Sequence, residues 1–371
     1  MSLTIKTTKL QEMVSRVVKG AGADPVIELS DALSISLQKK TLTLITTDRT
    51  NYLYIKEPKV DGEDFNITVK VDLFSNLISK LTCEDVILSV NEEEGTLEVI
   101  GNGSYLIELM NDVDDSVVHF PDPMKDIKFK AGSHLPLSVV QASLTTVKQA
   151  LLVPKSKSDN PTPWYSAYYV GDKITASDST KICQMTVKDK LFKEPVLITA
   201  HQMELLGVMQ ADKIDVMIQD GLMIFSSPDC VIYCHILDGI ESFAIGPITD
   251  LCNLEMEGHC KLPKGALVQV LDRLALFVDE YDKNGVYLTF TKDGLQISSM
   301  KSSGIEIIKY LEKEKKVKEF TCCVDIKLLQ SQIKALIGDT IDLYYGVDNA
   351  IKIIEDNIVQ VISLLEDSRT K

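Results

Sequence analysis

Catalytic signatures are scarce in this chain, which has only five histidines among its 371 residues. It lacks a glycine-rich phosphate loop with its lysine, and no histidine accompanies a serine or cysteine in the arrangement of a nucleophile and its base. No apolar run approaches the length of a membrane span. The N-terminal stretch MSLTIKTTKLQEM lacks the cationic and apolar regions of a signal peptide. We therefore expect a cytoplasmic protein that is not an enzyme.

Positive charge is also in short supply. Lys plus Arg number 39 against 54 Asp plus Glu, so the net charge is −15. Non-specific affinity for nucleic acid comes from neutralising phosphates, so a simple basic nucleic-acid binder is disfavoured. A local basic face can still exist inside an acidic protein. The length favours two or three domains, and it allows a large core without disulfides.

The eight cysteines do not form a regular disulfide framework, because Cys322 and Cys323 are adjacent. We expect reduced thiols. Six candidate zinc ligands fall between residues 230 and 260: Cys230, Cys234, His235, Cys252, His259 and Cys260. A zinc site needs four convergent ligands. Cys230 and Cys234 lie on an alternating segment where both would be buried on one face, so buried thiols are favoured and no metal or cofactor is expected.

The chain repeats one pattern three times. A short strand followed by an amphipathic helix is predicted in residues 3–19, 127–151 and 258–278. The helices begin near Thr8, Ser138 and Lys264, at intervals of 130 and 126 residues. The regular spacing indicates tandem repeats.

A strand–turn–strand element follows in each copy, in residues 42–55, 173–187 and 294–308. Asp48 and Asp178 hold matching places 130 residues apart, whereas the third copy has Ser299 or Met300 there. A second strand and helix then occur in residues 67–81, 196–209 and 320–336, followed by alternating strands. Each copy therefore reads β-α-β-β-β twice over.

Asp72 and Asp325 open the second helix in the first and third copies, and aspartate is a favourable helix cap. Proline-bearing connectors near Pro121 and Pro123, and residues 246–255, are typical of domain junctions. We predict an α+β fold with three domains, residues 1–122, 123–250 and 251–371.

Three tandem copies of this unit in an acidic chain of this length resemble the bacterial-type DNA polymerase III β subunit, the sliding clamp. The clearest local motif is ITASDSTKI, residues 174–182, which follows the family's pattern of an apolar residue, a small residue and Ser-Asp before a basic and an apolar residue. The sequence looks like a divergent member of this family. The resemblance implies three clamp domains, with outer antiparallel sheets and helices that face a central pore.

The resemblance further implies a non-catalytic processivity factor that encircles duplex DNA without reading its sequence. Its partners would be the replicative polymerase and the clamp loader, and two chains would form a head-to-tail homodimer. Contacts to phosphates carry no sequence information. The predicted helices have basic or neutral outer faces, which agrees with this role. The candidate DNA-facing residues are Lys9, Arg16, Lys19, Lys80, Lys148, Lys155, Lys157, Lys264, Arg273, Lys327 and Lys334.

Two further sites are implied by the resemblance. An apolar cleft between the second and third domains would take short partner peptides. Its candidate residues are Ser177, Asp178, Ser179, Thr180, Lys181, Ile182, Pro247, Leu251, Val361, Ile362 and Leu364. Many family members have Gly-His-Arg where this chain has Ser179-Thr180-Lys181, so its partner peptide can differ. The candidate dimer contacts are Tyr105, Ile107, Leu276 and Phe277.

Two other functions stay open at this point. One is an acidic scaffold or DNA mimic of the same fold that does not encircle DNA. The other is a hydrolase that uses the cysteine and histidine cluster or the acidic segments 61–64, 92–94 and 112–115. These segments fall in turns between predicted strands, where they are most simply solvated loops.

Overall fold

The computed structural model describes residues 1–22, 29–110, 118, 120–125, 127–151, 166–188, 191–301, 303–313, 319–347 and 349–366. The chain forms two compact units. Unit 1 comprises Met1–Val140 and His201–Ile236, and unit 2 comprises Gln141–Ala200 and Leu237–Lys371. The chain passes between the units after Val140, Ala200 and Ile236, and all three places fall within the second predicted domain. The division into three domains stays a prediction.

The elements follow the predicted order in all three copies. The first copy has β1 (Ser2–Lys6), α1 (Thr7–Val17), β2 (Ala32–Gln38), β3 (Thr41–Thr47), β4 (Asn51–Pro58), β5 (Phe65–Lys70), α2 (Val71–Lys80), β6 (Asp85–Asn91), β7 (Thr96–Ile100) and β8 (Ser104–Glu108). The second has β9 (Ser133–Pro136), α3 (Leu137–Thr145), β10 (Ala167–Val170), β11 (Lys173–Ser177), β12 (Lys181–Thr186), β13 (Val196–Thr199), α4 (Ala200–Leu206), β14 (Lys213–Gln219), β15 (Leu222–Ser226) and β16 (Cys230–His235).

The third copy is preceded by one extra helix, α5 (Ile245–Asn253). It has β17 (Gly258–Pro263), α6 (Lys264–Leu274), β18 (Gly285–Phe290), β19 (Leu295–Ser299), β20 (Ile305–Ile308), β21 (Glu312–Lys313), β22 (Phe320–Asp325), α7 (Ile326–Ala335), β23 (Thr340–Val347), β24 (Ala350–Glu355) and β25 (Ile358–Ser363). Short 3-10 turns follow three helices, at Val18–Gly20, Val147–Ala150 and Ala275–Phe277, and another lies at Ile240–Ser242. The α+β class and the repeated β-α-β-β-β halves are thus confirmed.

The strands form antiparallel sheets that join successive copies. In unit 1 the orders are β1-β6-β7-β8 and β5-β2-β3-β4-β16-β15-β14-β9. The remaining two are β13-β10-β11-β12-β25-β24-β23-β17-β21 and β20-β19-β18-β22. The β4–β16 pair joins the first copy to the second, and the β12–β25 pair joins the second to the third. Strands β8 and β20 are left at sheet edges.

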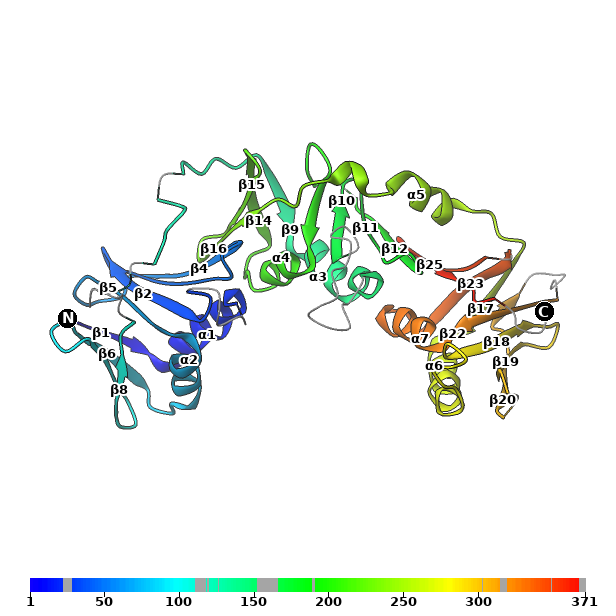
Figure 1. The fold of residues 1–371 in the computed structure, drawn as a ribbon, viewed down its shortest axis with the longest axis horizontal. Helices are drawn as coiled ribbons and strands as arrows, with labels where there is room; N and C mark the ends of the chain where they lie inside the picture. Colours follow the sequence, from blue (N-terminus) through cyan, green and yellow to red (C-terminus); the bar gives the residue numbers. More distant parts are fainter. Residues whose placement is uncertain are drawn as a thin grey trace. The chain divides into compact units, whose positions relative to one another are not determined.

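The helices lie in pairs on one face of the sheets, as α1 with α2 and α6 with α7 (Figure 1). Helix α1 buries Leu10, Met13, Val14 and Val17, which recur at helical spacing. None of the helices within the described residues is long and apolar enough to cross a membrane.

The aspartates predicted as helix caps behave differently from each other. The carboxylate of Asp325 accepts hydrogen bonds from the backbone N–H groups of Lys327, at 2.7 Å, and Leu328, at 3.2 Å. Asp325 therefore caps α7 as predicted. The prediction for Asp72 was wrong, because α2 begins one residue earlier, at Val71, and Asp72 lies inside its first turn. An acidic side chain is still favourable there, next to the positive end of the helix dipole.

Candidate functional site

Unit 2 contains a pocket of about 280 Å³ where the second and third copies meet. Its lining comes from the β11–β12 turn, from α5 and from the ends of β24 and β25. The lining residues are Ser177, Ser179, Thr180, Lys181, Ile182, Ala244, Pro247, Ile248, Leu251, Asn349, Ala350, Val361 and Ser363. Apolar side chains from α5 and the strands, with hydroxyl groups and one ammonium, suit a small apolar ligand segment with a few polar anchors.

The turn at the pocket is shaped by Asp178. Its Oδ1 accepts hydrogen bonds from the backbone N–H groups of Thr180 and Lys181, both at 3.0 Å, and from the Thr180 hydroxyl at 2.7 Å. Its Oδ2 lies 3.5 Å from the Lys181 Nζ. Ser179 has a φ of 73°, in the left-handed region that favours glycine.

The apolar centre of the pocket is a cross-strand pair. Ile182 on β12 lies opposite Val361 on β25. Both belong to a buried cluster with Ala350 and with Ile248 of α5. Helix α5 therefore forms one wall of the pocket.

Eight of the eleven predicted pocket residues line this one pocket; their role in binding stays a prediction. Three lie elsewhere. Asp178 holds the turn instead of facing the pocket, Ile362 is fully buried, and Leu364 follows the end of β25. Alternation along β25 explains Ile362, because neighbours on a strand point to opposite faces. The structure adds Ala244, Ile248, Asn349, Ala350 and Ser363. Residues two apart on a strand share a face, so Val361 could have suggested Ser363 as a pocket residue. Only the fold brings Ala350 of β24 to the pocket.

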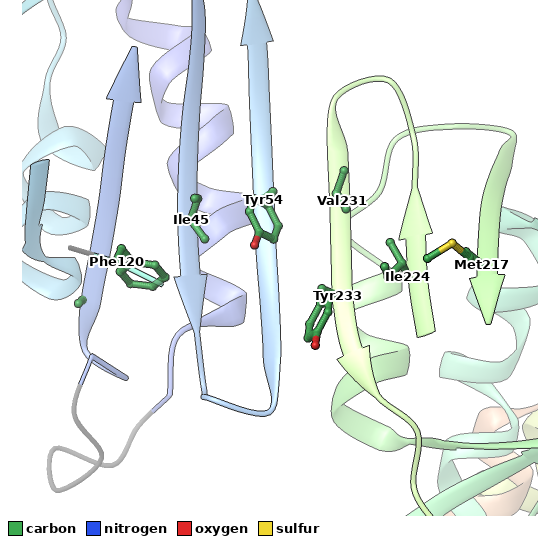
Figure 2. Packing of buried hydrophobic residues seen from close by; sticks show 8 residues of the cluster. Ile45, Tyr54, Phe120, Met217, Ile224, Val231 and Tyr233 are labelled. Atoms are coloured by element: carbon green, nitrogen blue, oxygen red, sulfur yellow. The ribbon is translucent and has the colours of Figure 1, made fainter. Parts of the chain in front are cut away.

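The equivalent junction in unit 1 carries larger side chains. The β4–β16 pair places Tyr52 opposite Tyr233, where the β12–β25 pair has Ile182 and Val361. The ring of Phe120, from the connector between the copies, packs edge-on against Tyr52 with 6.4 Å between centroids. Figure 2 shows Phe120 and Tyr233 on the same sheet face as Tyr54, Val231 and Ile224. The first junction is thus covered by the chain's own aromatic side chains.

Most of the predicted DNA-facing cations are engaged within the protein. The Lys9 Nζ lies 3.0 Å from Glu57 and 3.3 Å from Glu12. Lys334 pairs with Asp272 at 2.8 Å, and Lys327 lies 4.0 Å from Glu280. Exposed ion pairs of this kind contribute little to stability, so these ammonium groups can exchange partners.

Two other candidates make hydrogen bonds to acceptors in the third copy, and a third is partly buried. The Arg273 guanidinium makes two hydrogen bonds to Glu306 on β20, at 2.8 and 2.6 Å, which raise the pKa of Arg273 and lower that of Glu306. The Lys264 ammonium donates to the backbone oxygen of Leu336, just beyond α7. Lys148 is half-buried.

Arg16 requires a correction, because it does not face solvent. Its side chain is only 8% exposed. Its NH1 lies 2.7 Å from Asp229, and its Nε donates to the Val208 carbonyl at 2.9 Å. A helical wheel places Arg16 on the polar side of α1, but the second copy packs over that side. Arg16 therefore joins two copies within unit 1.

Lys19 and Lys80 are exposed, and within the described part of the chain neither forms an ion pair. Between α1 and α2 lies a groove of about 550 Å³. Its lining combines hydroxyl and amide groups with three apolar side chains and one carboxylate: Thr8, Gln11, Glu12, Val14, Ser15, Val18, Ser75, Asn76, Ile78 and Ser79. Lys155 and Lys157 lie outside the described residues.

The predicted dimer contacts are mostly exposed apolar groups. Leu276 is 81% exposed, Phe277 50% and Tyr105 39%. The prediction for Ile107 needs correction, because Ile107 is only 2% exposed, whereas its neighbour Leu106 is 70% exposed. The reason is strand alternation, which sends Ile107 into the core.

The cysteine and histidine side chains do not gather into a metal site. Within the described residues no three His, Cys, Asp or Glu side chains are placed to share an ion. Cys230 and Cys234 lie on β16, and burial raises the pKa of the Cys230 thiol to about 12. The arrangement is that of buried, protonated thiols.

Comparisons with known proteins agree with this architecture. Residues 1–116 match the family model of the DNA polymerase III beta subunit, N-terminal domain. A search of curated proteins finds no match. The resemblance stated from the sequence is confirmed.

Solved clamp structures share the fold along the whole chain. The DNA polymerase sliding clamp from Bacillus subtilis is 18% identical, with 99% of each chain covered and a TM-score of 0.81. The beta subunit from Streptococcus pyogenes is 15% identical, with coverage of 99% of this chain and 100% of that one and a TM-score of 0.83. The beta subunit from Thermotoga maritima is 12% identical, with the same coverage and a TM-score of 0.82. This chain therefore has the clamp fold.

Proposed function

We propose that this chain, with the fold of bacterial DNA polymerase β subunits, is a non-catalytic sliding clamp. Two copies would close head to tail around duplex DNA, each contributing the three domains 1–122, 123–250 and 251–371. The ring would tether the replicative polymerase through a peptide in the unit 2 pocket, after a clamp loader has placed it on DNA. Residence on DNA would then depend on topology, so sequence-independent contacts would suffice.

The observation that carries this proposal is the pattern of strand pairing between copies. In both internal junctions, the last strand of one copy's first half pairs with the last strand of the next copy's second half: β4 with β16 and β12 with β25. The third copy's equivalent strand is β20, and the first copy's is β8. The same pairing between β20 and β8 of a second chain is heterologous, and it closes a ring if the rotation permits.

The register of this contact follows from the repeat. Ser299 N–H donates to the Gly304 carbonyl, as Asp178 N–H donates to Lys181, so Ile305 corresponds to Ile182. Leu106 corresponds to Val361 by cross-strand pairing from equivalent strands, β6 and β23. The fifth residue of β6, Ser89, pairs with Glu98, which pairs with Leu106. The fifth residue of β23, Tyr344, pairs with Lys352, which pairs with Val361. Ile305 would thus face Leu106 of the partner subunit. Ile305 is 56% exposed, as expected of an edge kept for pairing.

The exposed groups near β20 fit the same contact. The Phe277 ring lies beside Gly304, where an added Cβ would come within 3.4 Å of it. Leu276 precedes it in sequence. These side chains, Ile305 and Ile307 give this end of unit 2 several exposed apolar groups on neighbouring elements, a feature typical of protein interfaces.

A cross-link tests the register and the ring together. Leu106→Cys and Ile305→Cys in one chain should form a covalent dimer on oxidation, whereas each single variant should not form that bond. The double variant is diluted, mixed with circular plasmid, concentrated and oxidised. Protein should then stay on the circle in high salt and leave when the circle is cut.

Each other outcome has a distinct meaning. If no disulfide forms between these positions, the proposed junction falls. If a covalent dimer forms but is lost equally from circular and linear DNA, the chain dimerises without encircling DNA. The acidic scaffold would then replace the clamp.

The pocket is tested separately with a fluorescein-labelled Asp-Leu-Phe peptide. Its two apolar side chains suit Ile182, Val361 and Leu251, and its carboxylate suits the Lys181 ammonium. Fluorescence polarisation should show saturable binding to the full chain. Binding that is non-saturable would remove the peptide role from the pocket.

A further inference from the structure

Lys352 is a buried cation opposite the pocket residue Val361 in the β24–β25 pair. It lies on β24, is 8% exposed as a residue, and has no carboxylate within ion-pair distance among the described residues. Its Nζ donates to the backbone carbonyls of Leu254, at 2.6 Å, and Cys252, at 3.4 Å. It also lies 5.6 Å from the centre of the Tyr344 ring. Burial lowers the pKa of Lys352, the sign of a costly position for a charge.

The carbonyls that Lys352 meets are the terminal ones of α5. The last carbonyls of a helix lack partners within the helix, and they form the negative end of its dipole. A buried ammonium satisfies both needs, and an aromatic face adds further stabilisation. Helix α5 has no side-chain cap at its N-terminus, and only Ile248 and Cys252 are buried. Its C-terminal end is therefore the end that a polar contact fixes.

The repeat offers an internal comparison. Ile224 of β15 holds the place of Lys352, because each pairs with the fifth residue of the preceding strand, Met217 or Tyr344. Ile224 belongs to an apolar cluster, with Met217 and Tyr233 beside it on the same sheet face (Figure 2). The lysine thus occurs at the junction between the second and third copies, where the connecting segment contains helix α5.

Helix α5 supplies Pro247, Ile248 and Leu251 to the pocket. We propose that Lys352 is a positioning residue for this pocket: by capping the C-terminal end of α5, it holds that wall against β12 and β25. This inference rests on the proposed function of the pocket. Its physical content is preorganisation, since a wall that is already ordered does not have to be ordered by the ligand.

Lys352→Met tests it, because methionine keeps much of the apolar stem and removes the ammonium. Affinity for the Asp-Leu-Phe probe should fall roughly tenfold, as expected for loss of a partly buried helix-terminal cation. Hydrogen exchange of the α5 amides should become faster, while exchange in α7 stays unchanged. Lys352→Arg keeps the charge and should restore most of both. Lys193→Met, at an exposed lysine of the same unit, is the matched control.

The outcomes separate the two proposals. If the unaltered chain does not bind the probe, the pocket's proposed function fails, and α5 exchange alone then decides whether Lys352 caps the helix. If the unaltered chain binds and Lys352→Met binds equally well, the positioning role is overturned. If Lys352→Met fails to fold, Lys352→Arg decides: normal exchange and binding support the role, and lost binding with normal exchange overturns it.

Discussion

At the scale of single residues, one turn is closed by equivalent side chains in each copy. Asp48 accepts from the backbone N–H of Thr50 and Asn51, as Asp178 does in the second copy. In the third copy the Ser299 hydroxyl oxygen accepts from the N–H groups of Ser303 and Gly304, so serine fills the aspartate's place. Local hydrogen bonds of this kind fix tight turns. The Ser-Asp motif is therefore explained by turn geometry, and its neighbours supply the pocket.

Asp48 has a second partner, His201 at the start of α4, whose Nε2 lies 3.3 Å away. The hydrogen bond to Asp48 raises the pKa of His201. Burial would raise the pKa of Asp48, but hydrogen bonds from His201 and Asn51 outweigh it and lower that pKa. Stabilisation by the raised histidine is complete below its ordinary pKa of about 6.5 and disappears as pH rises through the folded value. Stabilisation by the aspartate disappears only in acid.

His201→Gln should therefore cost more stability near pH 6 than near pH 9. Urea denaturation at both values measures it, with Lys193→Gln as a control whose effect should not depend on pH. An equal loss at both values would show that the ion pair does not stabilise unit 1.

Ala350 is the residue that keeps the pocket open in our interpretation. Leu222 holds its place in unit 1, as the first residue of β15. Ala350→Leu should fill the pocket and lower affinity for the Asp-Leu-Phe probe by about tenfold or more, while overpacking costs about 1–3 kcal/mol. Polarisation titration and urea denaturation measure the two effects. Ala350→Ser, which changes little volume, should bind almost normally; unchanged binding by the leucine variant would place the probe elsewhere.

At the scale of elements, helix faces are decided by what packs on them. The helical spacing of Leu10, Met13 and Val14 agrees with their burial in α1. The same spacing predicts Arg16 in solvent, yet Asp229 and Val208 of the second copy cover it. The buried Arg16 guanidinium, with one carboxylate and one carbonyl partner, therefore links α1 to the second copy. The candidate DNA-facing cations of this segment are thereby reduced to Lys9 of α1 and Lys19 of the 3-10 turn that follows it.

Arg16→Met should lower the free energy of unfolding of unit 1 by about 2 kcal/mol, because it leaves Asp229 without its cation. Lys19→Met, at an exposed position in the 3-10 turn after α1, should change it by less than about 0.5 kcal/mol. Urea denaturation of the full chain compares them. If the two variants lose the same stability, the contacts of Arg16 with the second copy do not stabilise unit 1.

At the scale of the whole molecule, several candidate DNA-facing cations are already in ion pairs with carboxylates of the same chain. The net charge of −15 opposes tight electrostatic binding to DNA. Lys9, Lys334 and Arg273 already have carboxylate partners. Weak electrostatic attraction to DNA suits a protein that stays on DNA by topology, the role proposed above.

Lys19→Glu with Lys80→Glu should weaken binding to a short linear duplex and reduce its salt dependence by about two phosphate contacts. The cross-linked ring of the same variant should still remain on circular DNA. Lys188→Glu with Lys193→Glu changes the net charge equally at exposed positions of unit 2 and is the control. Equal effects of the two pairs would show that Lys19 and Lys80 do not face DNA.

The sequence by itself determined the repeated β-α-β-β-β order and the turn residues, because alternation, helical spacing and Asx turns act over a few residues. The family resemblance also named eight of the residues that line the unit 2 pocket, five of them within the contiguous segment 177–182. Only the tertiary structure decided which residues from distant elements meet. Arg16 reaches a carbonyl 192 positions away, and Lys352 reaches one 98 positions away. Such contacts depend on which surfaces pack together, and no local pattern of residues encodes that choice.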